Sequence, residues 1–553
     1  MGAVSLARGR GAFRSLAGNK ALVRVVGSYV LFTLTQYSVW VAMLVYAYRH
    51  GGAAVAGLVA VAQLVPAAVL APMAATVADR RSPVFLLAGG YLVQAAGMAA
   101  TAVTVIAGVP LAAYAAAVVA SAGVATTRPA QSTLIPSVSV TPDQLTAANL
   151  AVSWVEAAGI VAAGLMTGAL ISAAGIASVF AVCAGLGLTA ALLVAGLRVP
   201  PLASSPKRVP AVLGDLGASI GLAAHQPRLR LMLALLTAEA VVVGALDLLF
   251  VILAISVLHR PQAWAGYLNS AYGVGAVLAA GVSATLVGRR LGLPILGAAL
   301  FLSGGLAVLA FGLGLAATVA LLIVVGASRA LLDVAARTLM QRSVPTQLLG
   351  RIFGLLEGLT MAGLAAGALL VPALAHLGGS RLALLGVAAV LPLAAAVGGR
   401  GLLGLDSGTP VPVVQIALLR SLPLFAELPA PALEGLAGAL TPVSVPAGRV
   451  LIRQGEPGDA YYAIAAGELD ASQDGHFLRQ CGRGEGVGEI ALLRSIPRTA
   501  TVVAHTDATV YELDREPFLT AVLGHAPTQR QAGLIAGTRF ATRAAPTDRD
   551  TAG

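Results

Sequence analysis

Long apolar runs alternate with short polar or glycine-rich turns along residues 21–398. A helix needs about 20 apolar residues to cross the hydrocarbon core of a bilayer, and this length divides the region into twelve segments. The pattern therefore predicts an all-α membrane domain of twelve transmembrane helices. The expected spans are 21–48, 53–78, 84–107, 112–131, 146–173, 176–196, 229–257, 263–288, 293–313, 316–337, 348–371 and 380–398.

The pattern changes after a Gly-, Pro- and Asp-containing linker at residues 400–412. Short alternating runs separated by frequent turns follow, as in RVLIRQGEPGDAYYAIAAGELDAS and TVYELD. Such spacing is typical of a small β-roll or jelly roll. We expect this second domain at 413–526, with flanking helices at about 414–440 and 515–540, and a C-terminal helix and tail at 527–553.

Composition supports this division of the chain. The sequence is 58% hydrophobic and only 11% charged, whereas soluble domains carry about 25% charged residues. Residues 1–412 hold 23 Lys/Arg against 9 Asp/Glu, while residues 413–553 hold 12 Arg against 15 Asp/Glu. Because the positive excess belongs to the apolar part, it argues against a nucleic-acid surface and for no nucleic-acid partner.

The basic residues also predict an orientation in the membrane. With a cytoplasmic N-terminal tail at 1–20, 20 of the 23 Lys/Arg before residue 413 fall on the cytoplasmic side, and only Arg49, Arg260 and Arg381 fall outside. The positive-inside rule then predicts a multi-pass protein of the plasma (inner) membrane with both termini cytoplasmic. The first span is too long for a signal-peptide core. The Arg-rich, Lys-poor, Ala/Gly-rich usage is typical of a GC-rich bacterial genome.

An internal duplication is indicated by a basic, proline-containing linker at 198–228, between six-span halves at 21–197 and 229–399. Arg128 and Glu156 are 28 residues apart, as are Arg329 and Glu357, and TPDQL at 141–145 is echoed by VPTQL at 344–348. Parallel repeats of this kind occur in one large class of secondary transporters.

Residues 20–400 resemble a major facilitator superfamily transporter, most closely its proton-coupled exporters. The matching stretches are ADRRSP at 78–83 and TRPAQSTLIPSVSVTPDQLTAANL at 127–150. The resemblance implies that Asp79 and Arg80 are gating charges. The loop departs from the family pattern at Ala75 and at Ser82, where relatives usually have Gly, and the second-half loop ending GRR at 288–290 lacks the Asp.

Four acidic residues fall inside expected spans, where a charge is costly and usually faces a cavity or a partner. Glu239 lies near mid-membrane, Asp247 two turns beyond it, and Glu156 and Glu357 nearer the cytoplasm. They are candidates for a site that binds a coupling proton or a cationic substrate. The alternative is that they form buried ion pairs, with Glu156 and Glu357 sharing a structural role with Arg128 and Arg329.

Other polar residues in the spans allow two interpretations. Arg329, Asp333 and Arg337 share one helix face at i, i+4 and i+8, which favours a structural clamp. Gln36 lies at helical spacing from Tyr29, Thr33 and Trp40. This stripe either lines a mixed polar and aromatic cavity or packs against neighbouring helices.

Several reaction classes lack their residues in this sequence. The seven His show no metal-ligand spacing, and the two Cys, Cys183 and Cys481, indicate no disulfide framework, so we expect no metal site. The sequence has two lysines, Lys20 and Lys207, and neither belongs to a Walker A motif, so we expect no ATP hydrolysis. A coupling ion, by default the proton, then remains as the energy source for moving an unknown small molecule. We expect no enzymatic activity.

A phosphate-binding arrangement occurs in VGEIALLRSIPRTATVVA at 487–504. Gly488 to Leu493 can form one helical turn whose free N–H groups point at an anion. Arg498 can reach the same place with a guanidinium suited to phosphate oxygens. Glu489 can accept a hydrogen bond from a sugar hydroxyl. Phosphate and ribose bound on one loop indicate a nucleotide.

Residues 413–526 resemble a cyclic nucleotide-binding domain, through RQGEPGDAYYAIAAGEL followed by GEGVGEIALLRSIPRTATVVA. The resemblance implies that Glu489 holds the ribose 2′-hydroxyl, Arg498 the cyclic phosphate, and Ala491 and Thr499 complete the ring. Thr499 occurs in binders of cAMP and of cGMP, so both remain open as regulatory ligands. The alternative is a domain that has lost its ligand. The expected nucleotide-binding residues are Val487, Gly488, Glu489, Ile490, Ala491, Leu492, Arg498, Thr499 and Ala500.

These expectations combine into a secondary transporter, most simply a proton-coupled exporter, regulated by cytoplasmic cAMP or cGMP. Two alternatives remain, a cyclic nucleotide receptor on a transport-dead scaffold and a cyclic nucleotide-gated channel. A channel would require a carbonyl filter such as TVGYG, and AYGVG at 271–275 is not that filter. A DNA-binding regulator is excluded, since no helix-turn-helix pattern follows the nucleotide domain.

Overall fold

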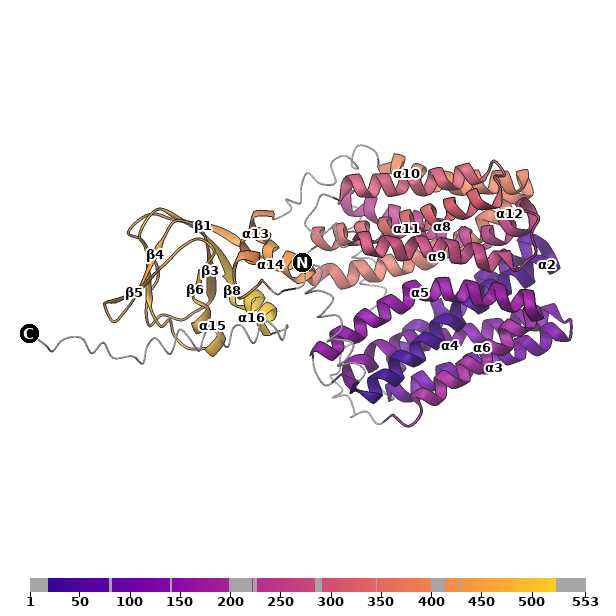
Figure 1. The fold of residues 1–553 in the computed structure, drawn as a ribbon, viewed down its shortest axis with the longest axis horizontal. Coiled ribbons are helices and arrows are strands. Elements are labelled where there is room, and N and C mark those ends of the chain that lie inside the picture. Colours follow the sequence, from indigo (N-terminus) through magenta and orange to yellow (C-terminus); the bar gives the residue numbers. More distant parts are fainter. Residues whose placement is uncertain are drawn as a thin grey trace, which may run out of the picture. The chain divides into compact units, whose positions relative to one another are not determined.

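The structure is a computed structural model. It describes residues 18–78, 82–139, 142–197, 221, 226–283, 291–344, 346–398, 413–426, 428 and 430–523. The chain divides into two compact units, a helical unit that ends at Thr409 and a β-rich unit that begins at Pro410. Figure 1 shows the helices of the first unit running side by side and the strands of the second curling around a core. The predicted fold class is confirmed.

The N-terminal half of the helical unit consists of the helices that precede residue 198. Helix α2 is 59 residues long and contains a break at Gly51 and Gly52, where Gly52 has φ 64°. This break separates the first two expected spans, because only glycine takes that conformation without steric cost. The helices that the structure describes in this half are α2 (Lys20–Ala78), α3 (Pro83–Ile106), α4 (Pro110–Val138), α5 (Pro142–Ala174) and α6 (Ile176–Val194).

The C-terminal half repeats this organisation with its long helix at the end. Helix α12 breaks at Gly378 and Gly379, where Gly379 has φ 70°, between the last two expected spans. Helix α8 continues into a π-helical turn, η1. The elements are α8 (Pro227–Ile252), η1 (Leu253–Val257), α9 (Trp264–Ser283), α10 (Gly292–Leu309), α11 (Leu315–Ser343) and α12 (Thr346–Gly398).

Eight helical stretches among the described residues are long and apolar enough to cross a bilayer. Two of these stretches, Lys20–Val65 and Arg351–Ala396, are 46 residues long and each contains one of the Gly-Gly breaks. Every expected span overlaps a helix, so the helical content matches the expectation. Twelve membrane crossings nevertheless remain a prediction.

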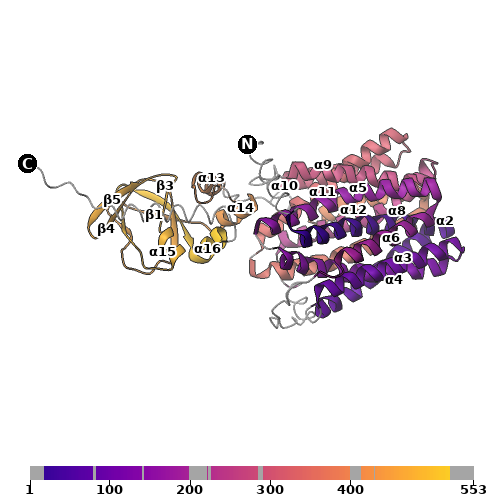
Figure 2. The same cartoon turned by 60° about the horizontal axis from the view of Figure 1, so that its bottom comes forward.

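Glycines let the helices of this unit approach closely. A β-carbon on Gly266 of α9 would lie 2.6 Å from the carbonyl oxygen of Gly164 on α5, and one on Gly363 of α12 would lie 2.9 Å from Thr237 O on α8. In a membrane no hydrophobic force drives helices together, so they associate partly through close packing, which small residues at the helix crossings allow. Figure 2 shows the resulting close bundle from a second direction.

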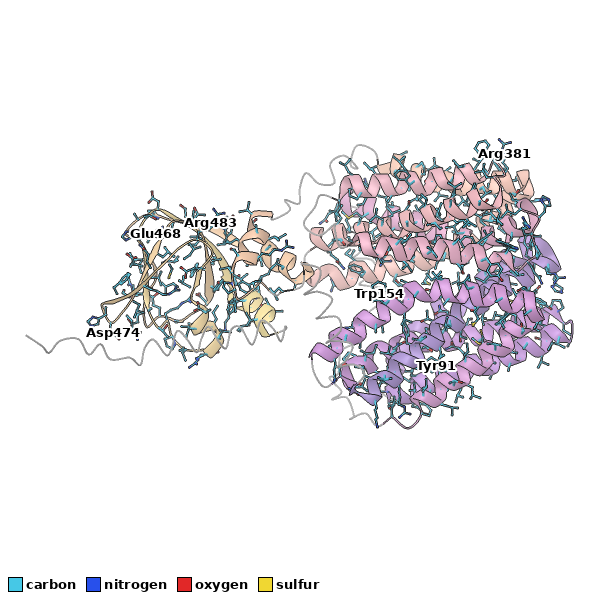
Figure 3. The ribbon with its side chains drawn as sticks, in the orientation of Figure 1. Tyr91, Trp154, Arg381, Glu468, Asp474 and Arg483 are labelled. Atoms are coloured by element: carbon cyan, nitrogen blue, oxygen red, sulfur yellow. The ribbon has the colours of Figure 1, made fainter. Side chains whose placement is uncertain are left out.

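The β-rich unit is built from two four-stranded antiparallel sheets, in the orders β1-β8-β3-β6 and β2-β7-β4-β5. Their inner faces enclose a core that includes Ile464, Leu469, Cys481 and Val510. Figure 3 shows charged side chains such as Glu468, Asp474 and Arg483 on this unit. The strands are β1 (Thr441–Val445), β2 (Val450–Ile452), β3 (Ala460–Ala466), β4 (Leu469–Gln473), β5 (His476–Cys481), β6 (Gly486–Val487), β7 (Thr501–Ala504) and β8 (Ala508–Asp514).

A second core lies where helices cover the outside of the first sheet. Helices α13 (Val413–Ser421), α14 (Ala430–Gly438) and α16 (Arg515–Leu523) contribute to it. Its centre is a cluster of three rings, in which Phe518 stacks on Tyr461 at 5.1 Å and Phe425 meets both edge-on. These helices match the expected segments at 414–440 and 515–540 as far as the structure describes them.

Several predictions lie outside the described residues. They are the N-terminal tail before residue 18, the gating charges Asp79 and Arg80, most of the linker at 198–228, the linker at 400–412 and the chain after residue 523. The side chain of Arg128 also lies outside the described part of α4. The proposed domain boundaries at these segments stay predictions.

Candidate functional site

A pocket in the β-rich unit lies between the second sheet and the loop that carries the predicted phosphate-binding residues. Eight of the nine residues predicted to bind nucleotide line it. Leu492 does not, because it is 1% exposed and packs into the helical core of this unit. The lining residues are Ile452, Ala471, Gln473, Leu478, Arg479, Cys481, Val487, Gly488, Glu489, Ile490, Ala491, Arg498, Thr499, Ala500 and Val502.

A short helix positions the loop side of the pocket. Helix α15 (Glu489–Arg494) begins directly after Gly488, which has φ 95° and ψ −2°, and ends at Ser495, which also has a positive φ. The two left-handed residues lie seven positions apart and confine the helix to the six residues between them. The expected helical turn is therefore present, with Glu489 at its start and 3% exposed.

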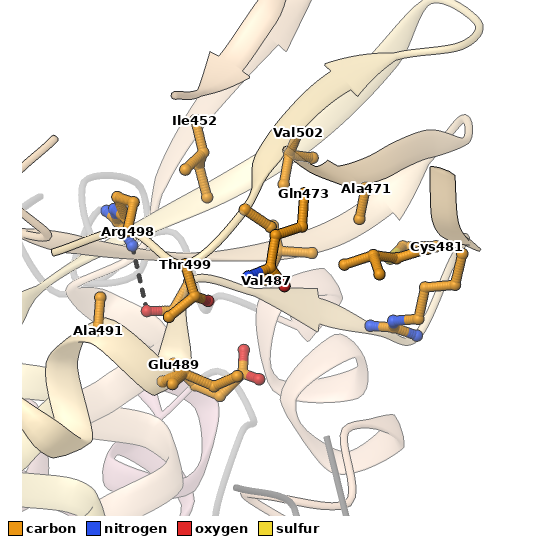
Figure 4. Close-up of a pocket in the computed structure, with 15 residues that line it drawn as sticks. Ile452, Ala471, Gln473, Cys481, Val487, Glu489, Ala491, Arg498, Thr499 and Val502 are labelled. Carbon is orange, nitrogen blue, oxygen red and sulfur yellow. Dashed lines mark hydrogen bonds between the residues drawn. The ribbon is translucent and has the colours of Figure 1, made fainter. Parts of the chain in front are cut away.

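Arg498 is the buried cation of the pocket, with 6% of its surface exposed. Its Nη1 donates to the carbonyl oxygen of Gly488 at 3.1 Å and its Nη2 donates to that of Ala460 at 2.7 Å. Figure 4 shows Arg498 at one end of the pocket, facing the start of the α15 loop. Two backbone carbonyls thus fix the guanidinium where an anion can approach it.

The charge of Arg498 is only weakly balanced by the protein. The carboxylate of Asp459 lies 3.7 Å from Nη2, and the Asp459 side chain is 92% exposed. Burial lowers the pKa of the Arg498 guanidinium below its ordinary value, because removal from water disfavours the charged form. A buried cation normally requires a close, hydrogen-bonded anion, and a phosphate monoanion meets that requirement.

Two glycines leave room for this arrangement. A β-carbon on Gly488 would lie 2.5 Å from Arg498 Nη1, and one on Gly458 would lie 2.6 Å from the β-carbon of Ala491 and 3.3 Å from Arg498 Nε. Gly458 belongs to the Glu-Pro-Gly-Asp stretch at 456–459, just before β3. This stretch has a direct role in the site, since it admits both the α15 loop and the guanidinium.

The opposite wall of the pocket comes from β4 and β5, which lie outside the predicted phosphate-binding stretch at 487–504. Ala471 and Gln473 alternate inward on β4, and Arg479 pairs with Ala471 from β5. The register shifts between Ala471 and Ser472, so Leu478 lies in a bulge beside Arg479. A bulge turns two neighbouring side chains toward one face. The period-2 alternation of β4 indicates that Ala471 and Gln473 share one face, but it does not indicate that this face lines the pocket.

Arg479 is a second cation at the pocket, with a carboxylate partner of its own. Its Nη1 donates to Glu485 Oε1 at 2.8 Å, and Glu485 Oε2 accepts from the backbone N–H of Gly482 at 2.9 Å. The side chains of Arg479 and Glu485 are 36% and 41% exposed. Arg479 therefore differs from Arg498, whose nearest partners are carbonyl oxygens.

The helical unit brings several of the predicted charged residues together. Arg329 on α11 pairs with Glu239 on α8, with 2.6 Å between Nε and Oε1, and Glu239 is 3% exposed. The spacing of 28 residues had instead associated Arg329 with Glu357, which is exposed. Arg337 pairs with Asp333 one turn away at 2.6 Å, as expected for a clamp on one helix face.

Two further predicted acids contact aromatic side chains of α2. The hydroxyl of Tyr29 donates to Glu156 Oε1 at 2.5 Å, and the indole N–H of Trp40 donates to Asp247 Oδ2 at 2.9 Å. The stripe that contains Gln36 therefore provides hydrogen-bond donors to carboxylates on α5 and α8. Gln36 itself is partly buried.

No group of three or more His, Cys, Asp or Glu side chains with metal-binding geometry occurs in the part of the chain that the structure describes. Both cysteines are buried and not bonded to each other.

Comparison with known families assigns each unit. The family profile described as Major Facilitator Superfamily matches residues 25–357, and the profile described as Cyclic nucleotide-binding domain matches residues 442–525. The first match covers more than half of the chain.

Two similar curated proteins each match a stretch of 104 residues of this chain. The cAMP-dependent protein kinase regulatory subunit of Aspergillus niger is 39% identical over 104 residues, covering 18% of this chain and 25% of that protein. The corresponding subunit of Emericella nidulans is 38% identical over 104 residues, with the same coverage. The matched region thus spans about a quarter of these curated relatives.

Solved structures give the same partial coverage. The regulatory domain of Toxoplasma gondii PKA with cAMP has 32% identity, covers 20% of this chain and 44% of that chain, and has a TM-score of 0.20. A cAMP-binding acyltransferase from Mycobacterium smegmatis has 36% identity, covers 23% and 41%, and has a TM-score of 0.20.

Proposed function

The chain belongs to the major facilitator superfamily, and we propose that it is a secondary active transporter regulated by a cyclic nucleotide that binds its C-terminal unit. The family points to transport of a small molecule rather than to enzymatic chemistry. The cyclic nucleotide-binding domain provides a site for a regulatory ligand.

The observation that carries the nucleotide proposal is the buried guanidinium of Arg498, held by the carbonyl oxygens of Gly488 and Ala460 at the edge of a pocket. In this proposal, Arg498 binds the cyclic phosphate with a charge-assisted, forked contact. Glu489 accepts a hydrogen bond from the ribose 2′-hydroxyl. Thr499 and the backbone of Ala491 complete the phosphate contacts, and the purine lies toward the wall formed by β4 and β5.

Titration of the full-length protein in detergent with a fluorescent cyclic nucleotide tests this site. We expect saturable binding that unlabelled cAMP or cGMP displaces, and loss of binding in Arg498→Ala. Arg483→Ala is the matched control, since Arg483 is an exposed arginine of the same unit that does not line the pocket. Binding that is equal in wild type and Arg498→Ala would contradict the assignment.

In the helical unit, the proposed coupling residues are Glu239 and Asp247. Both lie on α8, and each contacts a side chain from another helix. Glu156, Glu357 and Gln36 are secondary candidates. A carboxylate that exchanges a proton as the two halves move can couple a proton gradient to substrate transport. We propose export, with the proton as the counter-ion.

Proton coupling can be measured in inside-out vesicles that contain the protein and an entrapped pH dye. A screen of small molecules should identify substrates whose addition collapses an imposed proton gradient. We expect this response to be lost in Asp247→Asn and to be retained in Tyr511→Phe, which changes a partly buried residue of the β-rich unit. A substrate transported at the same rate with and without a proton gradient would contradict proton coupling.

Regulation requires that the nucleotide prefer one conformation of the transporter over another. We expect addition of cAMP or cGMP to change the transport rate of wild type and to leave that of Arg498→Ala unchanged. Equal rates with and without nucleotide, in protein that demonstrably binds it, would contradict regulation while leaving the binding site in place.

A transport-dead receptor is the second candidate. The observation that favours it is the ion pair between Glu239 and Arg329, because a carboxylate held by a fixed cation can serve structure alone. The two functions differ in one measurement. Transport of any substrate into reconstituted vesicles, driven by an ion gradient, excludes the receptor.

A further inference from the structure

The two carboxylates of α8 differ in what they connect. Glu239 pairs with Arg329 on α11, so both partners belong to the C-terminal half. Asp247 instead accepts the indole N–H of Trp40 on α2, at 2.9 Å, so its contact joins the two halves. Movement of one half against the other therefore leaves the Glu239 pair intact and separates Asp247 from Trp40.

Other hydrogen bonds between the halves lie toward the same end of the helices. Among the described residues, Tyr48 bonds to Ser256 at 2.8 Å, Arg49 donates to Gln262 at 3.1 Å, and Ser270 donates to the carbonyl oxygen of Val161 at 2.8 Å. We call this the Gly51 end, because α2 breaks at Gly51 there. Under the expected orientation, the Gly51 end faces outward.

Backbone contacts indicate that the halves are tightly packed near this end. A β-carbon on Gly57 of α2 would lie 2.5 Å from the carbonyl oxygen of Ala368 and 2.7 Å from Pro372 Cγ on α12. Gly164 and Gly266 bring α5 and α9 equally close. The structure thus represents the conformation in which the Gly51 end is closed.

The bond between Trp40 and Asp247 differs from the other three in its dependence on protons. The bonds of Tyr48, Arg49 and Ser270 involve hydroxyl, guanidinium, amide and carbonyl groups, which keep their charge at neutral and mildly acidic pH. Among these hydrogen-bond partners, Asp247 alone has a carboxyl group, which loses its negative charge when it is protonated. A hydrogen bond to a carboxylate is about twice as strong as one between neutral groups, so protonation weakens this contact and spares the others.

The groups facing Asp247 come from several helices. Trp40 on α2 contacts Asp247 directly, and Arg329 on α11 and Tyr272 on α9 interact with its charge at longer range. Helix α12, packed against α8 through Gly363 and Gly367, has no titratable residue between Glu357 and His376. Because Arg329 already pairs with Glu239, protonation of Asp247 leaves that cation with a partner.

We propose that Asp247 is a proton-operated latch of the Gly51 end, with Trp40 as its partner. When ionised, Asp247 holds Trp40 and keeps the halves together at this end. When protonated, it releases Trp40 and allows the halves to separate there. The proposal rests on the proposed function, since it assumes that the halves move as in a transporter, and it assigns the coupling role to Asp247 rather than to Glu239.

A distance between the halves at the Gly51 end reports the latch without any substrate. Spin labels on Ala107→Cys and Pro261→Cys place one probe on each half at exposed positions. The native Cys183 and Cys481 are buried, so the introduced cysteines are the ones that react. Pulsed EPR of full-length protein in nanodiscs then measures the distance distribution from about pH 8 to about pH 5, a range in which carboxyl groups removed from water change charge.

We expect one short distance at high pH and a second, longer distance that grows as the pH falls. Asp247→Asn is nearly isosteric and imitates the protonated acid. It should raise the ratio of long to short distances at high pH by about fivefold, which corresponds to the difference in strength between a charged and a neutral hydrogen bond. It should also remove the pH dependence of this ratio. Trp40→Phe should do the same, because it removes the donor and leaves the carboxyl group.

Tyr48→Phe is the matched control, since it removes a hydrogen bond between the halves that involves no titrating group. It should shift the ratio and preserve its pH dependence, as should Glu239→Gln. A wild-type pH response in both Asp247→Asn and Trp40→Phe overturns the latch, and so does a pH response lost only in Glu239→Gln. A pH-dependent distance in a protein that transports no substrate would reject the proposed function and keep the latch.

Discussion

The guanidinium of Arg498 occupies the space that a side chain at position 488 would need. Its Nη1 lies 3.1 Å from the carbonyl oxygen of Gly488, and a β-carbon on that glycine would come within 2.5 Å of the same nitrogen. Gly488 also has φ 95°, a conformation that costs other residues about 1–2 kcal/mol. The glycine and the arginine are therefore a matched pair, and replacing either one should displace the other.

Gly488→Ala should lose cyclic nucleotide affinity by at least about tenfold, because a shift of Arg498 by even a fraction of an ångström misaligns its fork for a phosphate. Displacement of a fluorescent cyclic nucleotide from the full-length protein measures this effect. Gly482→Ala is the control, since Gly482 lies in the same loop region and a β-carbon there would meet nothing within 4 Å. If both variants bind as wild type does, the coupling between Gly488 and Arg498 is unimportant for the ligand.

Arg498→Lys separates the charge of the side chain from its geometry. Lysine keeps the positive charge but cannot donate to Gly488, Ala460 and a phosphate in one plane. We expect cyclic nucleotide affinity to fall by about ten- to a hundredfold, the effect of losing one hydrogen bond to a charged group. Isothermal titration calorimetry should show the loss mainly in enthalpy. Affinity close to that of wild type would mean that charge alone attracts the ligand.

The nucleotide loop could be predicted from sequence because its chemistry is local. Gly488, Glu489 and Arg498 lie within eleven consecutive residues, so their spacing constrains where their side chains meet. Gln473 and Arg479 reach the same pocket only because β4 and β5 pair with a register shift. Register follows from packing of the whole roll, and a single strand of the sequence does not specify it.

The membrane helices show the same difference: their positions along the chain could be predicted from the sequence, but the contacts between them could not. Apolar length predicted where the helices lie, and Gly51–Gly52 and Gly378–Gly379 break the two long ones between expected spans. The partner of Arg329, by contrast, lies far away along the sequence. A repeat of 28 residues pointed to Glu357, whereas the packing of α11 against α8 brings Arg329 to Glu239, 90 residues away. Periodicity identifies a helix face but not the helix that covers it.

Phe518→Ala should destabilise the β-rich unit by about 3–5 kcal/mol, the usual effect of removing a fully buried phenylalanine. Phe518 is 0% exposed and stacks on Tyr461 while meeting Phe425 edge-on. Hydrogen exchange of the full-length protein, read out on peptides from β3 and β8, measures the loss. Phe477→Ala is the matched control, because Phe477 is 65% exposed and should change stability by less than about 0.5 kcal/mol. Equal protection in the two variants would contradict this core.

The pair of Glu239 and Arg329 makes a prediction that separates structure from transport. Removing Arg329 leaves the carboxylate of Glu239, whose side chain is 4% exposed, buried without its cation, and this costs about 3–5 kcal/mol. The Arg329 side chain is 28% exposed, so the loss of Glu239 costs less. Arg329→Gln should therefore lower the unfolding temperature of the full-length protein in detergent. Glu239→Gln should lower it as well, since Arg329 then lacks its carboxylate at 2.6 Å. The double variant should recover much of the loss, because two neutral amides can hydrogen-bond to each other at the same positions.

Transport by the double variant then shows whether the pair has only a structural role. If the pair is purely structural, a stable Glu239→Gln/Arg329→Gln protein should transport its substrate at close to the wild-type rate, since Asp247 and Trp40 are unchanged. If Glu239 itself carries the coupling proton, restored stability should not restore proton-coupled transport. Thermal unfolding and gradient-driven flux, measured on the same four proteins, distinguish these outcomes. Losses in stability that add without recovery would show that the 2.6 Å contact does not couple the two residues.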